Sequence, residues 1–200
     1  FPTRRSSDLM MIANAHGCSS VWGGSAPTCG YTKNEKGQGP AWATSLFEDN
    51  AEYGFGMLVA EKAERKLLAT YVDAAVEVAG PELKEALVEW KEKMNEGTGT
   101  RDRAAKVIAL LEAEKDGKPA LEQVYKMKQF LVKRSQWLFG GDGWAYDIGY
   151  GGLDHVLAMN EDINVLVFDT EVYSNTGGQA SKATPTAAVA QFAASGKKTK

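Results

Sequence analysis

The stretch Gln136–Phe139 (QWLF) runs into the glycine-rich turn Gly140–Gly143 (GGDG), and further along the chain Ile163–Phe168 reads INVLVF. The first stretch is a short apolar strand candidate, and the second is a nearly continuous apolar run, as expected for a strand buried on both faces. Between them, Asp147–Met159 has the pattern of a helix. A last helix is predicted over Thr186–Ala194, after a Thr-Pro pair that caps it. The order strand, helix, strand, helix predicts a parallel βαβ unit over residues 136–196 and an α/β fold.

The residues before this unit divide into a loop-rich part and a helical part. Met10–Asn14 is a strand candidate, and the chain from there to Thr44 is rich in Gly, Pro, Ser, Thr and Asn, which predicts a long functional loop. Residues 45–134 hold 17 of the 26 acidic and 15 of the 23 basic residues, so we expect a helical segment with a solvated outer face. A Ser-x-x-Glu capping box predicts a helix start at Ser45.

Glycines divide this helical segment into several helices. Gly80 and Pro81 end one helix and start the next, and Gly97 and Gly99 break the chain again. The apolar positions that recur at helical spacing are Leu83, Leu87 and Trp90, then Val107, Ile108, Leu110 and Leu111, then Leu121, Val124, Tyr125, Met127 and Leu131. These positions predict an apolar inner face, and we expect no chemistry in this segment.

The composition is that of a globular chain. The chain is 44% apolar and 24% charged. Its length of 200 residues is enough for one sizeable core, or for about one and a half domains. With 26 acidic and 23 basic residues the net charge is −3, which argues against a protein that binds nucleic acid. No apolar run approaches the length of about 20 residues that a helix needs to span a bilayer. We therefore expect that the chain is not a membrane protein. The two cysteines, Cys18 and Cys29, cannot form a disulfide-dense scaffold.

Both ends of the sequence lack the features of a natural terminus. Phe1–Leu9 (FPTRRSSDL) resembles the translation of a sequencing-library adaptor, although a natural disordered basic tail is the alternative, and we leave it out of the fold. Gly196–Lys200 stops in mid-loop, just past the last predicted helix. We therefore expect residues 10–200 to be a partial domain from the interior of a longer chain.

Oxygen-bearing side chains follow both strands of the βαβ unit. Gly141–Gly143 comes after the first strand, and Asp169–Asn175 (DTEVYSN) comes after the second. The carboxyl ends of parallel strands meet at one edge of a sheet, where ligands bind, so we expect Asp142 and Thr170 to be neighbours. A carboxylate, a hydroxyl and a backbone carbonyl are oxygen ligands that Mg²⁺ accepts beside phosphate and water. Gly-Asp-Gly alone also makes plain turns, but together with the second loop it predicts a Mg²⁺-diphosphate site.

Longer strings carry a more specific resemblance. They are Ala13–Ser20 (ANAHGCSS), Gly39–Ala43 (GPAWA), Ser45–Glu52 (SLFEDNAE) and Asp169–Gln179 (DTEVYSNTGGQ). Together with the Gly-Asp-Gly turn, which resembles the thiamine diphosphate signature, they make Met10–Lys200 similar to the pyruvate:ferredoxin (flavodoxin) oxidoreductases. The resemblance implies a fragment of the C-terminal thiamine diphosphate-binding domain of that family, with a parallel sheet flanked by helices and a helical insertion at residues 45–134.

The resemblance also implies an activity and a set of roles. The family converts pyruvate and coenzyme A to acetyl-CoA and CO₂ on thiamine diphosphate, and it passes electrons through [4Fe–4S] clusters to ferredoxin or flavodoxin. Mg²⁺ would be bound by Asp142, Thr170 and the Val172 carbonyl. Asn175 would be catalytic, because an uncharged amide beside the reacting carbon can donate to developing negative charge. The cofactor would contact Gly141, Asp142, Gly143, Trp144, Thr170, Glu171, Val172, Tyr173, Ser174 and Asn175.

By the same resemblance, Cys18 is one of the four cysteine ligands of the [4Fe–4S] cluster nearest the cofactor. The other three ligands would lie outside this chain, so the fragment alone should hold no cluster and should be inactive. Cys29 has no family counterpart and receives no role. His16 stands where the family commonly has Thr, and we interpret it and His155 as structural residues.

The resemblance implies further partners and leaves alternatives open. The remaining domains of the parent chain and a second copy in a homodimer are expected, whereas nucleic acid and membranes are not. Free thiols and low-potential clusters favour a reducing cytoplasm. A non-redox thiamine diphosphate enzyme domain and an inactive binding remnant are the alternatives. The residues do not distinguish ferredoxin from flavodoxin, or pyruvate oxidation from pyruvate synthesis.

Overall fold

A computed structural model describes residues 9–24, 27, 29–35 and 37–199. The chain forms two compact units, one with Phe1–Leu58 and Ser135–Lys200 and the other with Val59–Arg134. We predict that Phe1–Leu9 is adaptor sequence. Of these residues only Leu9 is among those that the structure describes.

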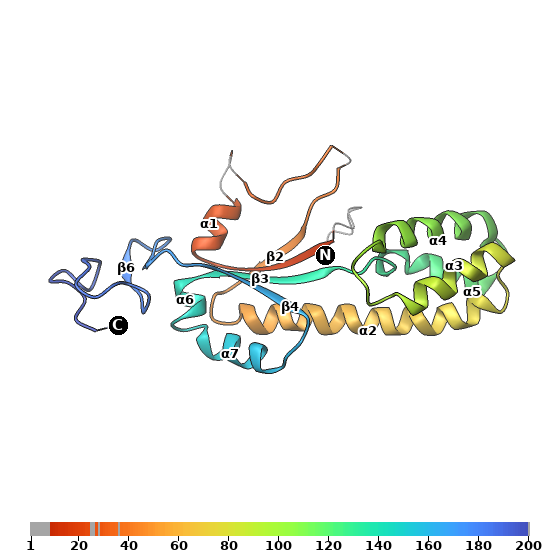
Figure 1. Cartoon of the computed structure of the whole chain (residues 1–200). Helices are drawn as coiled ribbons and strands as arrows, with labels where there is room; N and C mark the ends of the chain where they lie inside the picture. Colours follow the sequence, from red (N-terminus) through yellow and green to blue (C-terminus); the bar gives the residue numbers. More distant parts are fainter. Residues whose placement is uncertain (1–8, 25–26, 28, 36, 200) are drawn as a thin grey trace. The chain divides into compact units, whose positions relative to one another are not determined.

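Four parallel strands form the main sheet of the first unit (Figure 1). They are β1 (Met10–Ala15), β2 (Ala41–Ser45), β3 (Ser135–Gly141) and β4 (Ile163–Phe168), in the order β2-β1-β3-β4. The crossover from β3 to β4 contains α7 (Tyr150–Ala158). The predicted α/β fold class, a parallel sheet flanked by helices, is therefore confirmed.

The register of the sheet decides where the loops of the predicted site begin. Gly141 of β3 pairs with Phe168 of β4, and both are the last residues of their strands. The residues that follow them, Asp142 and Asp169, therefore leave the sheet at the same edge. β1 pairs with β3 in the same direction, so α1 (Cys18–Gly24), which follows β1, begins at that edge as well.

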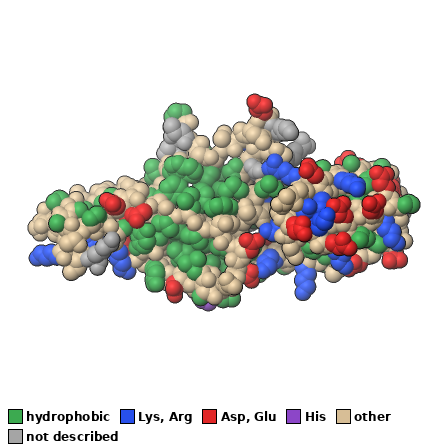
Figure 2. All heavy atoms as spheres, in the orientation of Figure 1, with side chains coloured by type: hydrophobic (Ala, Val, Ile, Leu, Met, Phe, Trp, Pro, Cys, Tyr) green, Lys and Arg blue, Asp and Glu red, His purple; other side chains and the backbone are tan. Residues whose placement is uncertain are grey.

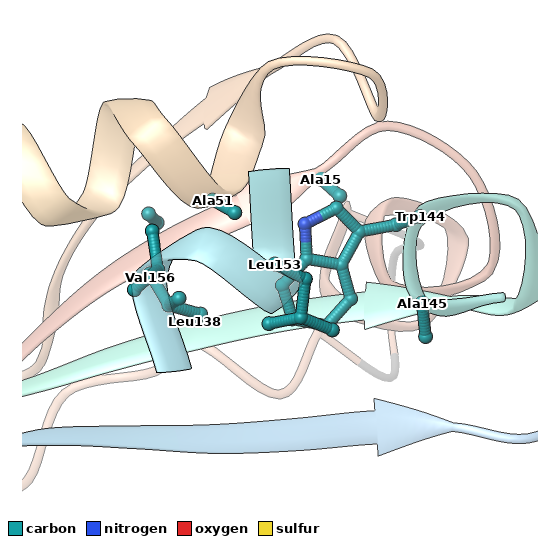
Figure 3. Close-up of a cluster of buried hydrophobic side chains, with 8 residues drawn as sticks. Ala15, Ala51, Leu138, Trp144, Ala145, Leu153 and Val156 are labelled. Carbon is teal, nitrogen blue, oxygen red and sulfur yellow. The ribbon is translucent and has the colours of Figure 1, made fainter. Parts of the chain in front are cut away.

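One face of the sheet packs against helices. The cluster of buried side chains on this face comprises Ala13, Ala15 and Leu138 of the strands, Ala51 of α2 (Asn50–Val76), Trp144 and Ala145 of the short α6 (Asp142–Ala145), and Leu153 and Val156 of α7 (Figure 3). A Cβ atom at Gly54 of α2 would overlap the Leu138 side chain, so glycine at this position lets α2 approach β3.

The opposite face carries aromatic rings that are only partly covered. The ring of Trp22 in α1 lies 5.2 Å from that of Phe168, and Trp22 is 44% exposed. Leu166 of β4 is 39% exposed. The prediction that Ile163–Phe168 is buried on both faces is therefore wrong, because the face that carries Leu166 and Phe168 is only partly covered. Figure 2 shows hydrophobic side chains gathered over this unit.

The second unit is made of helices and their connections. It contains the rest of α2, then α3 (Pro81–Glu92), α4 (Thr100–Glu114), α5 (Pro119–Lys126) and the 3-10 turn η1 (Lys128–Phe130). The predicted breaks are confirmed, since Pro81 is the first residue of α3 and Gly99, with φ 71°, precedes α4. The predicted positions that are buried are Leu83, Leu87, Trp90, Val107, Leu111, Leu121, Val124, Met127 and Leu131. Ile108, Leu110 and Tyr125 are only partly buried.

The predicted helix start at Ser45 is wrong. Ser45 is the last residue of β2, where it pairs with Ala15, and its carbonyl accepts a hydrogen bond from the His16 N–H at 2.9 Å. Helix α2 begins at Asn50, whose Nδ2 donates to the Ser45 Oγ at 3.0 Å. Strand pairing with β1 supplies hydrogen bonds along the whole segment, and a local cap supplies only one or two. Sequence reasoning missed β2 and α1 because both lie in a stretch with a loop composition.

The predicted helix over Thr186–Ala194 is absent. Its backbone pairs with distant partners instead, since the Ala187 N–H donates to the Lys197 carbonyl at 2.7 Å and the Gln191 N–H to the Gly178 carbonyl at 2.9 Å. Val189 is 73% exposed and Phe192 is 92% exposed. A helix this short is marginal without an apolar surface to pack against, which explains why the distant pairings prevail.

Two smaller features complete the first unit. Strands β5 (Val172–Tyr173) and β6 (Gln179–Ala180) form a separate antiparallel ribbon just beyond β4. Helix α7 begins at Tyr150, later than the predicted Asp147, because residues 142–145 form the separate turn α6. In the described part of the chain, none of the helices combines the length and the apolar character that crossing a bilayer requires.

Candidate functional site

A buried carboxylate lies where β3 ends. Asp142 is 0% exposed. Its Oδ1 accepts a hydrogen bond from the Thr170 N–H at 3.0 Å, and its Oδ2 accepts one from the Ser181 hydroxyl at 2.6 Å. The structure thus brings Asp142 and Thr170 together across the 28 residues that separate them, as expected of two loops that leave parallel strands at one edge.

The three predicted Mg²⁺ ligands are adjacent. Thr170 contacts both of the other ligands. Its backbone N–H donates to Asp142, and its hydroxyl donates to the Val172 carbonyl at 3.0 Å. A carboxylate, a hydroxyl and a carbonyl are therefore linked through contacts of hydrogen-bond length. These are hard oxygen donors, which Mg²⁺ prefers, usually with one or two carboxylates beside phosphate and water.

The charge balance at Asp142 fits a cation. A buried carboxylate is costly unless a counter-charge compensates it. Over the described ranges of the chain, no Lys, Arg or His side chain forms an ion pair with Asp142; its two hydrogen bonds come from neutral donors. No group of three or more His, Cys, Asp or Glu side chains that could hold a metal occurs among these residues. The donor set with its single carboxylate suits a cation that takes further oxygens from a diphosphate.

A cavity of about 250 Å³ opens beside Asp142. The predicted site residues on its wall are Cys18, Gly141, Asp142, Gly143, Trp144, Tyr173 and Asn175. Thr170, Glu171, Val172 and Ser174 do not line it. Thr170 and Val172 are linked to Asp142 as described above, Ser174 contacts Cys18, and Glu171 contributes its carbonyl oxygen to the turn at Ser181–Thr184.

Two glycines allow the close packing of this wall. A Cβ atom at Gly141 would lie 2.8 Å from both Cβ and Sγ of Cys18, and one at Gly143 would lie 2.5 Å from Cε1 of Tyr173. Real Cβ atoms do not approach other heavy atoms this closely. The glycines on either side of Asp142 are therefore needed so that α1 and the loop after β4 can reach the end of β3.

Cys18 lies at the meeting point of α1 and this loop. The Ser174 hydroxyl donates to its Sγ at 2.9 Å, and its Sγ lies 3.0 Å from the Thr170 Oγ1. Partial burial by itself would raise the pKa of the Cys18 thiol, but the hydrogen bond from Ser174 and the contact with the Thr170 hydroxyl, with smaller contributions from the backbone of Ser174 and Asp142, outweigh it. The net effect is a pKa below the usual thiol value, which favours the thiolate, the form that binds metals.

The other cysteine lies apart from this cluster of contacts. The Cys29 thiol donates to the Gly23 carbonyl at 2.6 Å. Neither cysteine forms a disulfide.

A second cavity has a volume of about 440 Å³. It is lined by Tyr146, Tyr150, Asp169, Lys182 and Ala183. The Tyr146 hydroxyl donates to Asp169 Oδ2 at 3.2 Å, and burial raises the pKa of Tyr146, with the charges of Asp169 and Asp142 adding to the shift. The Tyr173 hydroxyl donates to Asp147 Oδ2 at 2.7 Å, and burial together with this bond raises the pKa of Tyr173. Both phenols therefore stay protonated near neutral pH.

Sequence reasoning missed several residues of the site. His16, interpreted as structural, lies on the wall of the smaller cavity, as do Leu46, Phe47 and Thr176. Leu46 and Phe47 were assigned to a helix, whereas they belong to the connection between β2 and α2. Ser181 was missed because a serine in a polar loop carries no pattern of its own. The available signals were the departure of His16 from the family's usual Thr and the strings Ser45–Glu52 and Asp169–Gln179, which contain Leu46, Phe47 and Thr176.

Comparisons with known proteins agree with the resemblance in the sequence. No family model matches the chain. Curated relatives include a pyruvate-flavodoxin oxidoreductase from Klebsiella pneumoniae, 59% identical over 96% of this chain, and the pyruvate:ferredoxin oxidoreductase of Moorella thermoacetica, 54% identical over 96% of it. The NADP⁺-dependent mitochondrial pyruvate dehydrogenase of Euglena gracilis is 54% identical over 94% of the chain.

The chain spans only a small part of these relatives, 17% of the Klebsiella and Moorella proteins and 11% of the Euglena protein. The similarity nevertheless extends over almost the whole chain. The chain thus matches one segment of the pyruvate-flavodoxin and pyruvate:ferredoxin oxidoreductases.

Proposed function

We propose that this segment holds thiamine diphosphate through Mg²⁺ in an enzyme that oxidises pyruvate. The observation that supports it best is Asp142, a fully buried carboxylate whose two oxygens meet only neutral donors in the described structure, next to the Thr170 hydroxyl and the Val172 carbonyl. In this proposal Asp142, Thr170 and Val172 bind Mg²⁺. The backbone of Gly141–Gly143, on the wall of the cavity beside Asp142, would hold the diphosphate.

For the whole enzyme we propose the reaction of the family that the sequence resembles, and the names of the relatives support pyruvate and the electron acceptor. Pyruvate, coenzyme A and two oxidised one-electron carriers would give acetyl-CoA, CO₂, two reduced carriers and a proton. The bond between C1 and C2 of pyruvate would break, a thioester bond would form, and two electrons would pass to ferredoxin or flavodoxin; the [4Fe–4S] clusters, when bound, would supply the electron transfer. When bound, thiamine diphosphate supplies the carbon nucleophile and the electron sink that the loss of CO₂ requires.

Asn175 is the residue of this chain that we propose for catalysis. It lines the same cavity as Asp142 and Cys18. Its amide can donate a hydrogen bond to the oxygen of pyruvate as that oxygen gains negative charge, and a neutral donor does so without competing for a proton. Trp144 and Phe47, also on the cavity wall, would exclude water from the reacting carbon.

Cys18 is proposed as one ligand of a [4Fe–4S] cluster close to this cavity. The hydrogen bond from Ser174 and the contact with the Thr170 hydroxyl lower the pKa of its thiol and so favour the thiolate. A cluster of this kind needs four cysteines, and the Cys29 thiol is bound to the Gly23 carbonyl instead. The other three ligands would come from the rest of the parent chain, so the 200-residue segment by itself should be inactive.

The remaining partners are proposed on the same basis. They are pyruvate, coenzyme A, a ferredoxin or flavodoxin, the other domains of the parent chain and a second copy in a homodimer. A reducing cytoplasm would keep the thiols free and the clusters intact. Nucleic acid and membranes are not part of the proposal.

The test is a Mg²⁺ titration of the full-length enzyme that contains this segment. Asp142→Ala should abolish Mg²⁺-dependent binding of thiamine diphosphate measured by calorimetry, and Asp154→Ala on the exposed side of α7 should leave it unchanged. Binding by the Asp142 variant with wild-type affinity would contradict the assignment. Thiamine diphosphate binding without any reduction of ferredoxin or flavodoxin would instead favour a non-redox enzyme, and the absence of both would favour an inactive remnant.

A further inference from the structure

A turn that sequence reasoning did not single out reaches the buried carboxylate of Asp142. The turn is Ser181–Thr184, and the side chains of its two ends are buried, with Ser181 at 4% and Thr184 at 1% exposure. The Ser181 hydroxyl donates to Asp142 Oδ2 at 2.6 Å. Because an ionised carboxylate can only accept, the direction of this hydrogen bond is fixed.

The pattern of bonds at Asp142 leaves room for a metal ion. A carboxylate offers about four lone-pair positions on its two oxygens. The Thr170 N–H takes one position on Oδ1, and Ser181 takes one on Oδ2. One donor on each oxygen fixes the plane and the rotation of the carboxylate, and each oxygen keeps a lone pair that can face a cation.

The Ser181 hydroxyl is itself held in this orientation. The Ala183 N–H donates to the Ser181 Oγ at 3.1 Å, which turns the hydroxyl proton away from Ala183 and toward Asp142. The Ser181 N–H donates to the Thr184 Oγ1 at 2.9 Å, and the Thr184 hydroxyl donates to the Glu171 carbonyl. The turn is therefore tied to the loop that carries Thr170 and Val172.

A lysine closes the turn from the other side. The Nζ of Lys197 donates to three backbone carbonyls, those of Ser181 at 2.6 Å, Lys182 at 2.9 Å and Thr184 at 2.9 Å. An ammonium group has three protons, so all of them are used within this turn. Lys197 thus binds the backbone of the turn, while Ser181 contacts the carboxylate.

We propose that Ser181, anchored by Lys197, is a positioning residue that orients Asp142 for Mg²⁺. This inference rests on the proposed function, because it needs Asp142 to be a metal ligand. Residues that orient a ligand from behind commonly change metal affinity by about 10- to 100-fold when they are removed. Ser181 touches neither substrate nor cofactor in this proposal and acts only through Asp142.

The experiment measures Mg²⁺ affinity of the full-length apoenzyme by calorimetry, with thiamine diphosphate present and no pyruvate. Ser181→Ala should raise the Kd for Mg²⁺ about 10- to 100-fold, and Ser181→Thr, which keeps the hydroxyl, should restore most of the affinity. Lys197→Met should also raise the Kd for Mg²⁺. Lys182→Met is the matched control, since the exposed Lys182 ammonium only approaches Asp147 at 4.0 Å, and it should bind Mg²⁺ as the wild type does. In turnover assays, excess Mg²⁺ should restore the kcat of Ser181→Ala.

The outcomes separate the inference from the proposed function. If Asp142→Asn leaves the Mg²⁺ affinity unchanged, the proposed site itself is wrong. If Asp142→Asn weakens binding but Ser181→Ala stays within about twofold of wild type, Asp142 is a ligand and the role of Ser181 is refuted. A loss in Ser181→Ala that Ser181→Thr does not restore would also refute it. If Ser181→Ala does not fold, the Mg²⁺ affinities of Lys197→Met and Ser181→Thr test the role of Ser181 instead. Wild-type affinity in Lys197→Met together with weaker Mg²⁺ binding in Ser181→Thr would overturn the proposal.

Discussion

The Sγ of Cys18 lies 3.0 Å from the Oγ1 of Thr170, although 152 residues separate them in the chain. Cys18 follows β1 and Thr170 follows β4, and the parallel sheet brings both strand ends to one edge. In the proposed enzyme, these two residues bind different inorganic centres, the cluster and the Mg²⁺ ion. With these ligand roles, a cluster ligand and a Mg²⁺ ligand would be in direct contact, which would provide a short path for electrons.

Replacing Cys18 by Ser should separate the two halves of the reaction. In the full-length enzyme, Cys18→Ser removes one cluster ligand but leaves Asp142, Val172 and Asn175 in place. We expect exchange of CO₂ with the carboxyl group of pyruvate to stay within a few-fold of wild type and ferredoxin reduction to fall by about 100-fold or more. The matched control is Cys29→Ser, because its thiol only contacts the Gly23 carbonyl. Normal ferredoxin reduction by Cys18→Ser would refute the cluster role.

Asn175→Ala should lower kcat without releasing the cofactor. If the amide stabilises charge that develops on the substrate oxygen, its loss should reduce kcat by about 100- to 1000-fold. The Kd for thiamine diphosphate should change by less than about threefold, since the metal ligands remain. Steady-state kinetics and calorimetry measure these two quantities, and Asn95→Ala on the exposed surface of the helical unit is the control. A large change in cofactor affinity with an unchanged kcat would mean that Asn175 only binds the cofactor.

Gly141→Ala should destabilise the sheet unit, whereas Gly151→Ala should not. A Cβ at position 141 would lie 2.8 Å from Cys18 Sγ, but one at position 151 in α7 would meet nothing within 4 Å. Overpacking of this kind costs about 1–3 kcal/mol, and Gly to Ala in an exposed helix position gains about 0.5–1 kcal/mol. Scanning calorimetry of the full-length protein should show opposite shifts in Tm. Equal shifts for the two variants would contradict the close packing at Gly141.

The stability of the helical unit should depend on pH through Glu61. This side chain is 8% exposed, its Oε2 lies 3.1 Å from Arg134 Nη1, and its Oε1 has no hydrogen-bond partner in the described structure. Burial raises the pKa of Glu61, and this effect outweighs the opposing charges of Arg134 and Arg65. A raised pKa in the folded state adds stability below the unfolded pKa, and that stability is lost as the pH rises through the folded pKa.

Glu61→Gln removes this titration. The free energy of unfolding of the variant, relative to wild type, should therefore increase as the pH rises from about 4 toward 7. Hydrogen exchange of buried amides in α3 of the full-length protein, corrected for the intrinsic effect of pH, measures the local stability. Glu85→Gln removes an exposed carboxylate from α3. The pH dependence of its free energy of unfolding should run parallel to that of the wild type. A parallel profile for Glu61→Gln as well would show that Glu61 titrates alike in the folded and unfolded states.

The βαβ unit and the helical breaks were predictable because their signals are local. An apolar run such as Ile163–Phe168 can hardly be anything but a strand or a buried helix, and Pro81 after Gly80 fixes a helix start through backbone geometry alone. The pairing of β3 with β4 is the common arrangement for two consecutive strands joined by a helix. For this reason the neighbourhood of Asp142 and Thr170 could be expected before any coordinates were known.

Other features depend on partners far away in the sequence, and only the tertiary structure decided them. Ser45 has the pattern of a helix cap, yet it ends β2, because β1 offers it a neighbouring strand. Thr186–Ala194 has the pattern of a helix, yet its backbone bonds Lys197 and Gly178, because no apolar surface covers Val189 and Phe192. Ser181 shows no pattern, and its role at Asp142 comes from a turn that Lys197 closes. The sequence by itself determined β3, β4, the breaks between the helices of the second unit, and which oxygen atoms follow the two strands. Which of those atoms meet was decided by packing and hydrogen bonding in three dimensions, because each contact of this kind joins residues that no local pattern links.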